Sequence, residues 1–101
     1  MQEDILSGVL IDEAWLTLEQ LAAACRVEPA WLLAHAEEGL LPQAERLSET
    51  WRFSDKTVLR AQRMYRVEHD FDAIPELAAL VADMQEEMDA MRTQLYLLRK
   101  P

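Results

Sequence analysis

The sequence predicts a mainly α-helical fold, a winged helix-turn-helix with a small β wing that leads into a C-terminal dimerisation helix. Residues 16–42 (LTLEQLAAACRVEPAWLLAHAEEGLLP) contain two short helix-forming segments separated by a turn. The apolar run WRF follows at residues 51–53, and a heptad pattern of apolar residues occupies the C-terminal part. We expect residues 1–70 to form the winged helix-turn-helix and residues 71–101 the C-terminal helix or short coiled coil, within a single compact unit.

A capping box marks the start of the first helix. Thr17 suits the N-cap position, and Gln20 stands three residues later, so each side chain can bind the other residue's backbone N–H. Leu16 and Leu21 can pack around this turn as a hydrophobic staple. Before the helix, residues 8–11 (GVLI) are β-prone and predict a small strand.

The second helix is bounded by residues with narrow backbone preferences. Arg26 and Val27 make the predicted turn, and Pro29 suits the first helical position, where its missing N–H is not needed. Gly39 suits the left-handed residue just past the helix end, and Pro42 prevents the helix from resuming.

A wing and a third helix are predicted next. Residues 47–53 are too few for a helix and place Trp51 and Phe53 on alternating positions, which predicts a hairpin. Ser54 is expected to cap a third helix that runs to about Glu68. Its expected buried residues are Val58, Leu59, either Met64 or Tyr65, and in part Val67.

The fourth helix carries the heptad pattern. We expect Asp72 to cap it, with Pro75 in its first turn. Apolar residues then recur at alternating steps of four and three, and we name them the seam: Leu77, Val81, Met84, Met88, Met91, Leu95 and Leu98. At roughly 30 Å this helix is longer than the core formed by the preceding segments can cover. A homodimer is therefore expected, and burial of the helix within a monomer is the alternative.

Composition and charge narrow the class of protein. The chain has 101 residues with 19 acidic and 10 basic side chains, a net charge of −9. Residues 1–50 hold ten acids against two bases, so this half should attract basic surfaces. The single Cys25 excludes an internal disulfide and is expected in the core. With no apolar stretch long enough for a membrane and an acidic start at residues 2–4, a cytoplasmic location is expected.

Catalytic and metal-binding patterns are absent from the sequence. The two glycines are far apart, so there is no Gly-rich phosphate loop, and His35 and His69 are too distant to show a metal-ligand spacing. The carboxylates are scattered along the chain. We expect no enzymatic activity, no cofactor and no metal.

The charge of the second helix argues against DNA reading. Residues 28–38 contain no Lys or Arg, whereas a surface that binds DNA phosphates needs these cations. One basic stripe exists at helical spacing: Arg52, Lys56, Arg60 and Arg63. It could contact phosphates, but the favoured interpretation is that it pairs with acids of the N-terminal half or is solvated. Direct nucleic-acid binding is therefore expected to be absent or weak, which favours a protein partner.

The pattern LTLEQLAAACRVEPAWLLAHAEEGLLP…WRFSD resembles the N-terminal domain of MerR-type regulators, including the Gly39–Pro42 exit from the second helix. The resemblance implies a winged helix-turn-helix followed by a dimerising helix. The chain departs from that family where DNA is contacted, because Leu33, Ala34 and His35 replace the usual Arg and aromatic residues. A MerR-type DNA-binding transcriptional regulator remains the alternative function.

A closer resemblance is to the small chaperone-modulator family CbpM. It rests on EEGLLP, on ETWRFSD, on the basic third helix and on FDAIPELAALVADMQEEMDAM, in this order. The resemblance implies a protein that binds the J-domain of a CbpA-type co-chaperone. It also implies inhibition of that co-chaperone's activity with DnaK and of its DNA binding.

Two acidic regions could meet the basic helix that a J-domain presents. Lys and Arg are absent from residues 27–45 and from residues 68–87. Complementary charge speeds encounter and selects the partner, but affinity needs a buried apolar anchor as well. The candidate partner-binding acids are Glu37, Glu38, Asp70, Asp72, Glu76 and Asp83. The sequence leaves open which region contacts the partner.

Overall fold

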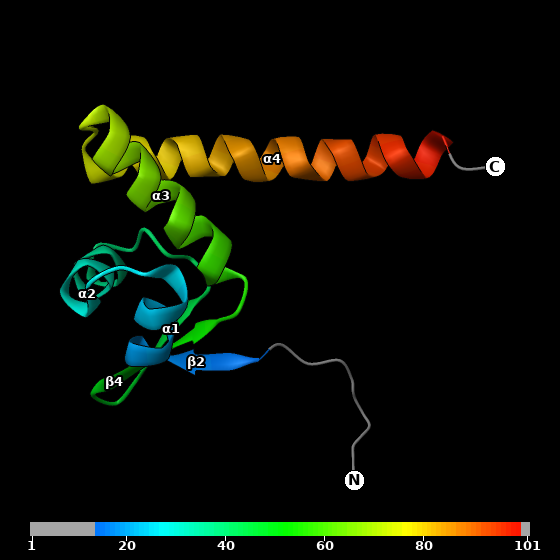
Figure 1. Cartoon of the computed structure of the whole chain (residues 1–101). Coiled ribbons are helices and arrows are strands. Elements are labelled where there is room, and N and C mark those ends of the chain that lie inside the picture. Colours follow the sequence, from blue (N-terminus) through cyan, green and yellow to red (C-terminus); the bar gives the residue numbers. More distant parts are fainter. Residues whose placement is uncertain (1–13, 100–101) are drawn as a thin grey trace, which may run out of the picture.

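The computed structural model describes residues 14–99 as a winged helix-turn-helix followed by two longer helices (Figure 1). This confirms the predicted mainly α-helical fold class. The predicted strand at residues 8–11 lies outside the described residues. The elements in chain order are β2 (Trp15–Thr17), α1 (Leu18–Cys25), α2 (Pro29–Glu37), β3 (Ala44–Leu47), β4 (Thr50–Ser54), α3 (Thr57–Phe71) and α4 (Pro75–Arg99).

A small antiparallel sheet forms the wing, with β4 between β2 and β3. Leu16 and Ala44 stand opposite Phe53 on the two neighbouring strands, and Phe53 is fully buried. The predicted hairpin is confirmed, but it begins earlier, at Ala44, and turns at Ser48 with φ 56°. Strand β2 was not expected, because WLT gains strand character only by pairing with β4.

Local sequence signals set the start of α1. The Thr17 hydroxyl accepts a hydrogen bond from the Gln20 N–H at 3.1 Å, and the Gln20 side chain accepts one from the Thr17 N–H at 2.9 Å. The predicted capping box is thereby confirmed. Arg26 ends α1 in a left-handed conformation, φ 61°, as part of the predicted turn.

The end of α2 is a Schellman motif. Gly39 has φ 76°, its N–H donates to the Ala36 carbonyl, and the Leu40 N–H donates to the His35 carbonyl, both at 3.0 Å. Nothing lies within 4 Å of where a Cβ at Gly39 would stand. Glycine is therefore favoured by the backbone conformation and not by lack of space.

Two predicted helix caps are corrected. Ser54 ends β4, where its hydroxyl accepts from the Lys56 N–H at 3.2 Å, and α3 begins at Thr57. Asp72 does not cap α4. It ends α3 with φ 54°, a left-handed conformation that Asp tolerates. The Ala78 N–H donates to the Ile74 carbonyl at 3.0 Å, so α4 starts after Ile74.

The phase of α3 also differs from the prediction. Met64 is buried as expected, but Leu59 and Tyr65 are exposed. The buried face is Thr57, Arg60, Ala61 and Met64, at helical spacing. The hydrophobic residues alone suggested another phase, because an arginine occupies a position on the true inner face.

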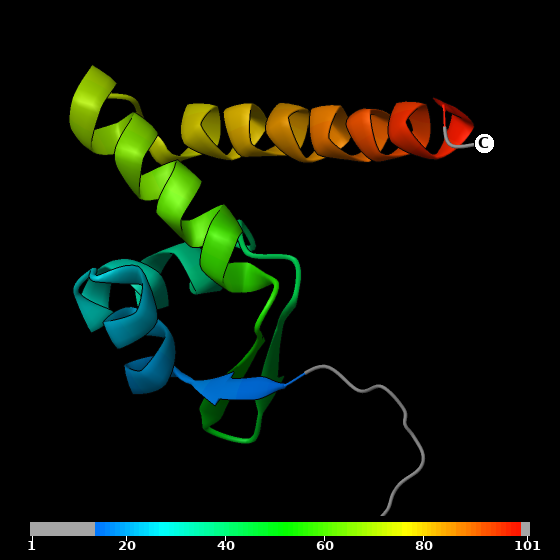
Figure 2. The same cartoon turned by 45° about the vertical axis from the view of Figure 1, so that its right-hand side comes forward.

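Helix α4 packs on α3 through small side chains and then extends away from the rest of the molecule (Figures 1 and 2). Ala78, Ala79 and Ala82 are its buried residues, and they belong to the same core as Leu21 and Phe53. Alanines allow the two helix backbones to approach closely. The C-terminal half of α4 makes no such contact, and all residues from Met91 to Arg99 are exposed.

Candidate functional site

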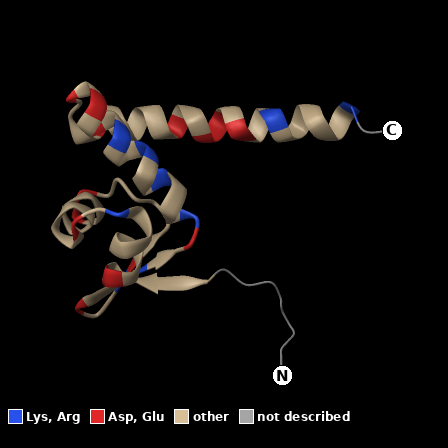
Figure 3. Ribbon diagram, viewed as in Figure 1, with Lys and Arg blue, Asp and Glu red and all other residues tan. Residues whose placement is uncertain are grey.

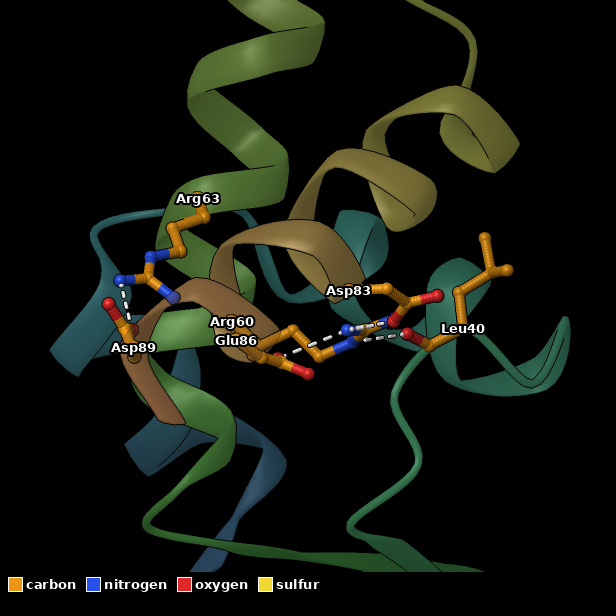
Figure 4. Close-up of polar contacts among 6 residues, drawn as sticks. All are labelled: Leu40, Arg60, Arg63, Asp83, Glu86 and Asp89. Atoms are coloured by element: carbon orange, nitrogen blue, oxygen red, sulfur yellow. Dashed lines mark hydrogen bonds and ion pairs between the residues drawn. The ribbon is translucent and has the colours of Figure 1, made fainter. Parts of the chain in front are cut away.

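Arg60 of the basic stripe is buried between three segments of the chain (Figure 4). Its Nε donates to the carbonyl of Leu40, at the exit from α2, at 3.0 Å. Its Nη1 donates to Asp83 at 2.8 Å and to Glu86 at 3.1 Å, both on α4. Only 4% of the Arg60 side chain is exposed, so its guanidinium is out of reach of a phosphate.

Two other arginines of the stripe also have acidic partners. Arg63 donates to Asp89 of α4 at 2.7 Å. Arg52 donates to Glu45 on the neighbouring strand at 2.8 Å and 3.0 Å, and its guanidinium lies 4.2 Å from the ring centre of Trp15. Lys56 lies in the exposed turn before α3.

The partners of the stripe differ in part from those expected. Pairing with an acid of the N-terminal half is seen for Arg52, whereas Arg60 and Arg63 pair with acids of the C-terminal helix. Figure 3 shows blue segments on α3 and red segments on α4, the two helices that these ion pairs connect. The contact between these two helices thus uses charges that a nucleic-acid interface would need.

The outward face of α2 carries no cation. Ala30, Ala34 and Glu37 are exposed and Leu33 is half-buried, and these four residues follow helical spacing on one side. A DNA-reading helix would need donors on this side. The structure instead shows two alanines and a leucine on this side, followed by the carboxylate of Glu37.

The opposite side of α2 is fixed to α3 by a polar cluster that sequence reasoning missed. His35 is buried, with its Nδ1 2.7 Å from the Trp31 carbonyl and its Nε2 2.7 Å from Glu68. The Trp31 indole N–H donates to the same carboxylate at 3.0 Å, and its ring stacks on His35 at 3.8 Å. Only the i, i+4 spacing of Trp31 and His35 could have indicated this cluster, and it does not reveal Glu68 as the partner.

The candidate partner-binding acids fall into separate places. Glu37 and Glu38 are exposed at the end of α2. Asp70, Asp72 and Glu76 are exposed around the corner between α3 and α4. Asp83 is held by Arg60, although 60% of its side chain remains exposed. The structure therefore does not bring the six acids together into one surface.

The seam is an exposed face of α4. Met84 is 55% exposed and Leu95 59%, and of the seven residues only Val81 is half-buried. At about 3.6 residues per turn, the face formed by the buried Ala78, Ala79 and Ala82 points away from the centre of the seam. Burial of the seam within one protomer, the alternative expectation, is therefore not what the structure shows.

Other site types find little support within residues 14–99. Cys25 is buried and donates to the Val58 carbonyl at 3.6 Å, and burial raises the pKa of its thiol to about 11. No cluster of three or more potential metal-ligating side chains occurs among these residues. In the same part of the chain, no helix combines the length and apolarity that a membrane crossing requires.

The comparison with protein families agrees with this fold. Residues 16–100 match the family model described as MerR HTH family regulatory protein, so the chain belongs to the MerR helix-turn-helix family. The comparison with curated proteins found no match. The comparison with solved structures found none either.

The pairing of Arg60 predicts an asymmetric response to mutation. Asp83→Asn combined with Glu86→Gln leaves a buried guanidinium without an anion and should lower the free energy of unfolding by about 2 kcal/mol, less than for a fully buried pair because both acids reach solvent. Arg60→Met leaves two solvated acids and one unpaired Leu40 carbonyl, and should cost about 1 kcal/mol. Urea denaturation measures both. The reverse order would show that the carboxylates do not hold Arg60.

DNA binding is expected to be absent or weak. With Arg60 and Arg63 paired, the remaining cations could at best support non-specific binding, with Kd about 10⁻⁴ to 10⁻⁶ M. An electrophoretic mobility shift at low salt tests this. A sequence-specific, salt-sensitive shift at nanomolar protein would contradict it and would favour a MerR-type transcriptional regulator.

Proposed function

We propose that this protein is a non-enzymatic, cytoplasmic modulator that binds the J-domain of a CbpA-type co-chaperone. In this role it inhibits the co-chaperone's activity with DnaK and its DNA binding. The observation that carries the proposal is the charge of the winged helix: its second helix presents no cation, and two arginines of the basic stripe are paired with α4.

The partner class follows from this charge distribution. The family scaffold is kept, but the side of α2 that would meet DNA ends in Glu37 and Glu38. Such a surface repels phosphates and attracts a basic protein surface. The resemblance to the CbpM family supports a J-domain as that surface, because a J-domain presents a basic helix to its Hsp70 partner.

Competition is the simplest mechanism of inhibition. A modulator that covers the basic helix of the J-domain prevents the same helix from reaching DnaK. Complementary charge speeds the encounter, and an apolar contact then provides the residence time. No chemical step is required of either partner.

We also propose that the protein acts as a homodimer through the seam. An exposed row of Leu and Met on a helix of 25 residues is the usual surface of a coiled coil. Acids dominate the first part of α4, and Arg92 and Arg99 lie in its last part. Antiparallel pairing would place each basic end beside an acidic start, so charge favours this direction.

The acidic regions are tested by charge reversal. Reversal of either contacting pair should slow association with the J-domain and flatten its salt dependence, since exposed interface charges act mainly on the association rate. The two double variants are Glu37→Lys with Glu38→Lys, and Asp70→Lys with Asp72→Lys. Surface plasmon resonance at several salt concentrations measures both.

Asp72 needs its own control because it ends α3 in a left-handed conformation. Asp72→Asn removes the charge and keeps a residue that tolerates this conformation. If both double reversals leave the association rate and its salt dependence unchanged, the acidic mechanism is wrong, even where J-domain binding itself is observed.

The dimer is tested on α4. Met84→Glu with Met88→Glu places like charges in the seam and should give monomers in sedimentation velocity. Ala90→Glu with Thr93→Glu adds the same charge at exposed positions on the other side of the helix, and should leave the dimer intact. A wild-type protein that sediments as a monomer at tens of micromolar would refute the dimer.

A further inference from the structure

A groove lies between the start of α1, the middle of α2 and the wing. It encloses about 520 Å³, and Leu33 of the outward face of α2 is part of its lining. Its lining residues are Thr17, Leu18, Glu19, Leu33, Glu49, Thr50, Trp51 and Arg52. None of them is among the candidate partner-binding acids, so the groove was not indicated by the sequence.

The apolar part of the groove is Leu18, Leu33 and Trp51. Leu18 and Trp51 pack against the core, whereas Leu33 is half-buried and is not part of the packing around the core. Trp51 is supported from behind by Phe53, with ring centres 6.1 Å apart. The groove thus has an aromatic wall that is packed on the core and one leucine side chain that is not.

Acids outnumber cations around the groove. Glu19 and Glu49 are exposed at its edge. Arg52 is paired with Glu45 and stacked over Trp15. Arg46 lies over the Trp51 ring, 5.7 Å from its centre. Phosphate is therefore a poor occupant, and a segment bearing Lys or Arg beside an apolar side chain is a good one.

One of the two acidic regions adjoins this groove. Glu37 follows Leu33 by one helical turn on the same side of α2. The corner between α3 and α4 also has exposed apolar residues, Phe71 and Ile74. However, Ile74 precedes Leu77 by three residues and so continues the seam, which the proposed dimer would cover.

We infer that the groove anchors an apolar side chain from the basic helix of the partner, with Glu19, Glu37 and Glu49 around it. The inference rests on the proposed function for the identity of the partner and selects one of the two acidic regions. Leu33 provides the contact that gives affinity, and the acids provide selection of the partner. The groove holds one or two side chains, so the rest of the partner helix lies on the surface beside it.

A matched pair of substitutions separates apolar anchoring from charge attraction. Leu33→Asp removes the apolar contact and adds a negative charge, and Leu59→Asp makes the same change at an exposed leucine outside the groove. If charge alone attracts the partner, both variants bind a J-domain as tightly as the wild type or tighter. The groove predicts a loss of about tenfold or more for Leu33→Asp only.

Folding is controlled in the same experiment. Circular dichroism must show unchanged helix content for both variants. As a second variant, Glu19→Lys with Glu49→Lys leaves the apolar contact in place and should slow association. Equal affinity of Leu33→Asp and Leu59→Asp for the J-domain would overturn the inference that the groove anchors the partner.

The groove and the proposed function fail in distinguishable ways. Amide chemical shifts of the ¹⁵N-labelled protein are followed with two probes, the J-domain of a CbpA-type co-chaperone and a synthetic amphipathic helix of Leu and Lys. Shifts around Leu33, Thr50 and Trp51 with both probes support both proposals. Shifts there with the peptide alone support the groove as a binding site and refute the J-domain as its partner. J-domain shifts confined to the corner between α3 and α4 refute the groove alone. No shift with either probe refutes both.

Discussion

The burial of Arg60 is the constraint on which the arrangement of this molecule depends. One guanidinium binds the exit from α2 through the Leu40 carbonyl and the last helix through Asp83 and Glu86. A buried guanidinium is stable only when an anion and hydrogen-bond acceptors lie within reach of it. Rotation of α4 relative to the helix-turn-helix would move Asp83 and Glu86 away from Arg60. Once α4 is held with its alanines against α3, the seam must face outward. The orientation of the seam therefore follows from the ion pairs and the alanine packing of α4, and not from the seam residues themselves.

The same contact decides the surface charge. Arg60 and Arg63 neutralise acids of α4 within the protein, and the acids of α1, α2 and the wing tip are left with few cations nearby. These two positive side chains serve as internal connections. A helix-turn-helix fold thus presents an acidic surface in this protein. Fold and ligand are independent in this respect, and function must be argued from the site.

The parts of the fold that local chemistry controls could be predicted from the sequence. The Thr17–Gln20 capping box and the Gly39 helix end depend on residues a few positions apart, and both were correct. The role of Asp72 could not be predicted, because Asp suits both an N-cap and a left-handed C-cap, and only the path of the chain selects one. The burial of Arg60 and His35 depends on partners at least twenty residues away. The groove needs three elements to meet, and periodicity within one segment does not show that.

The two surfaces proposed for binding lie at different ends of the molecule. The seam runs along α4, whereas residues of α1, α2 and the wing line the groove. Figure 1 shows α3 between α4 and these elements. Because they share no residue, dimerisation would leave a groove open on each protomer. One dimer would then bind two J-domains at once, and where those J-domains are linked, the second contact would form at a raised effective concentration. In this arrangement a modest affinity at each groove would be sufficient, because the link through the seam would bring the second contact.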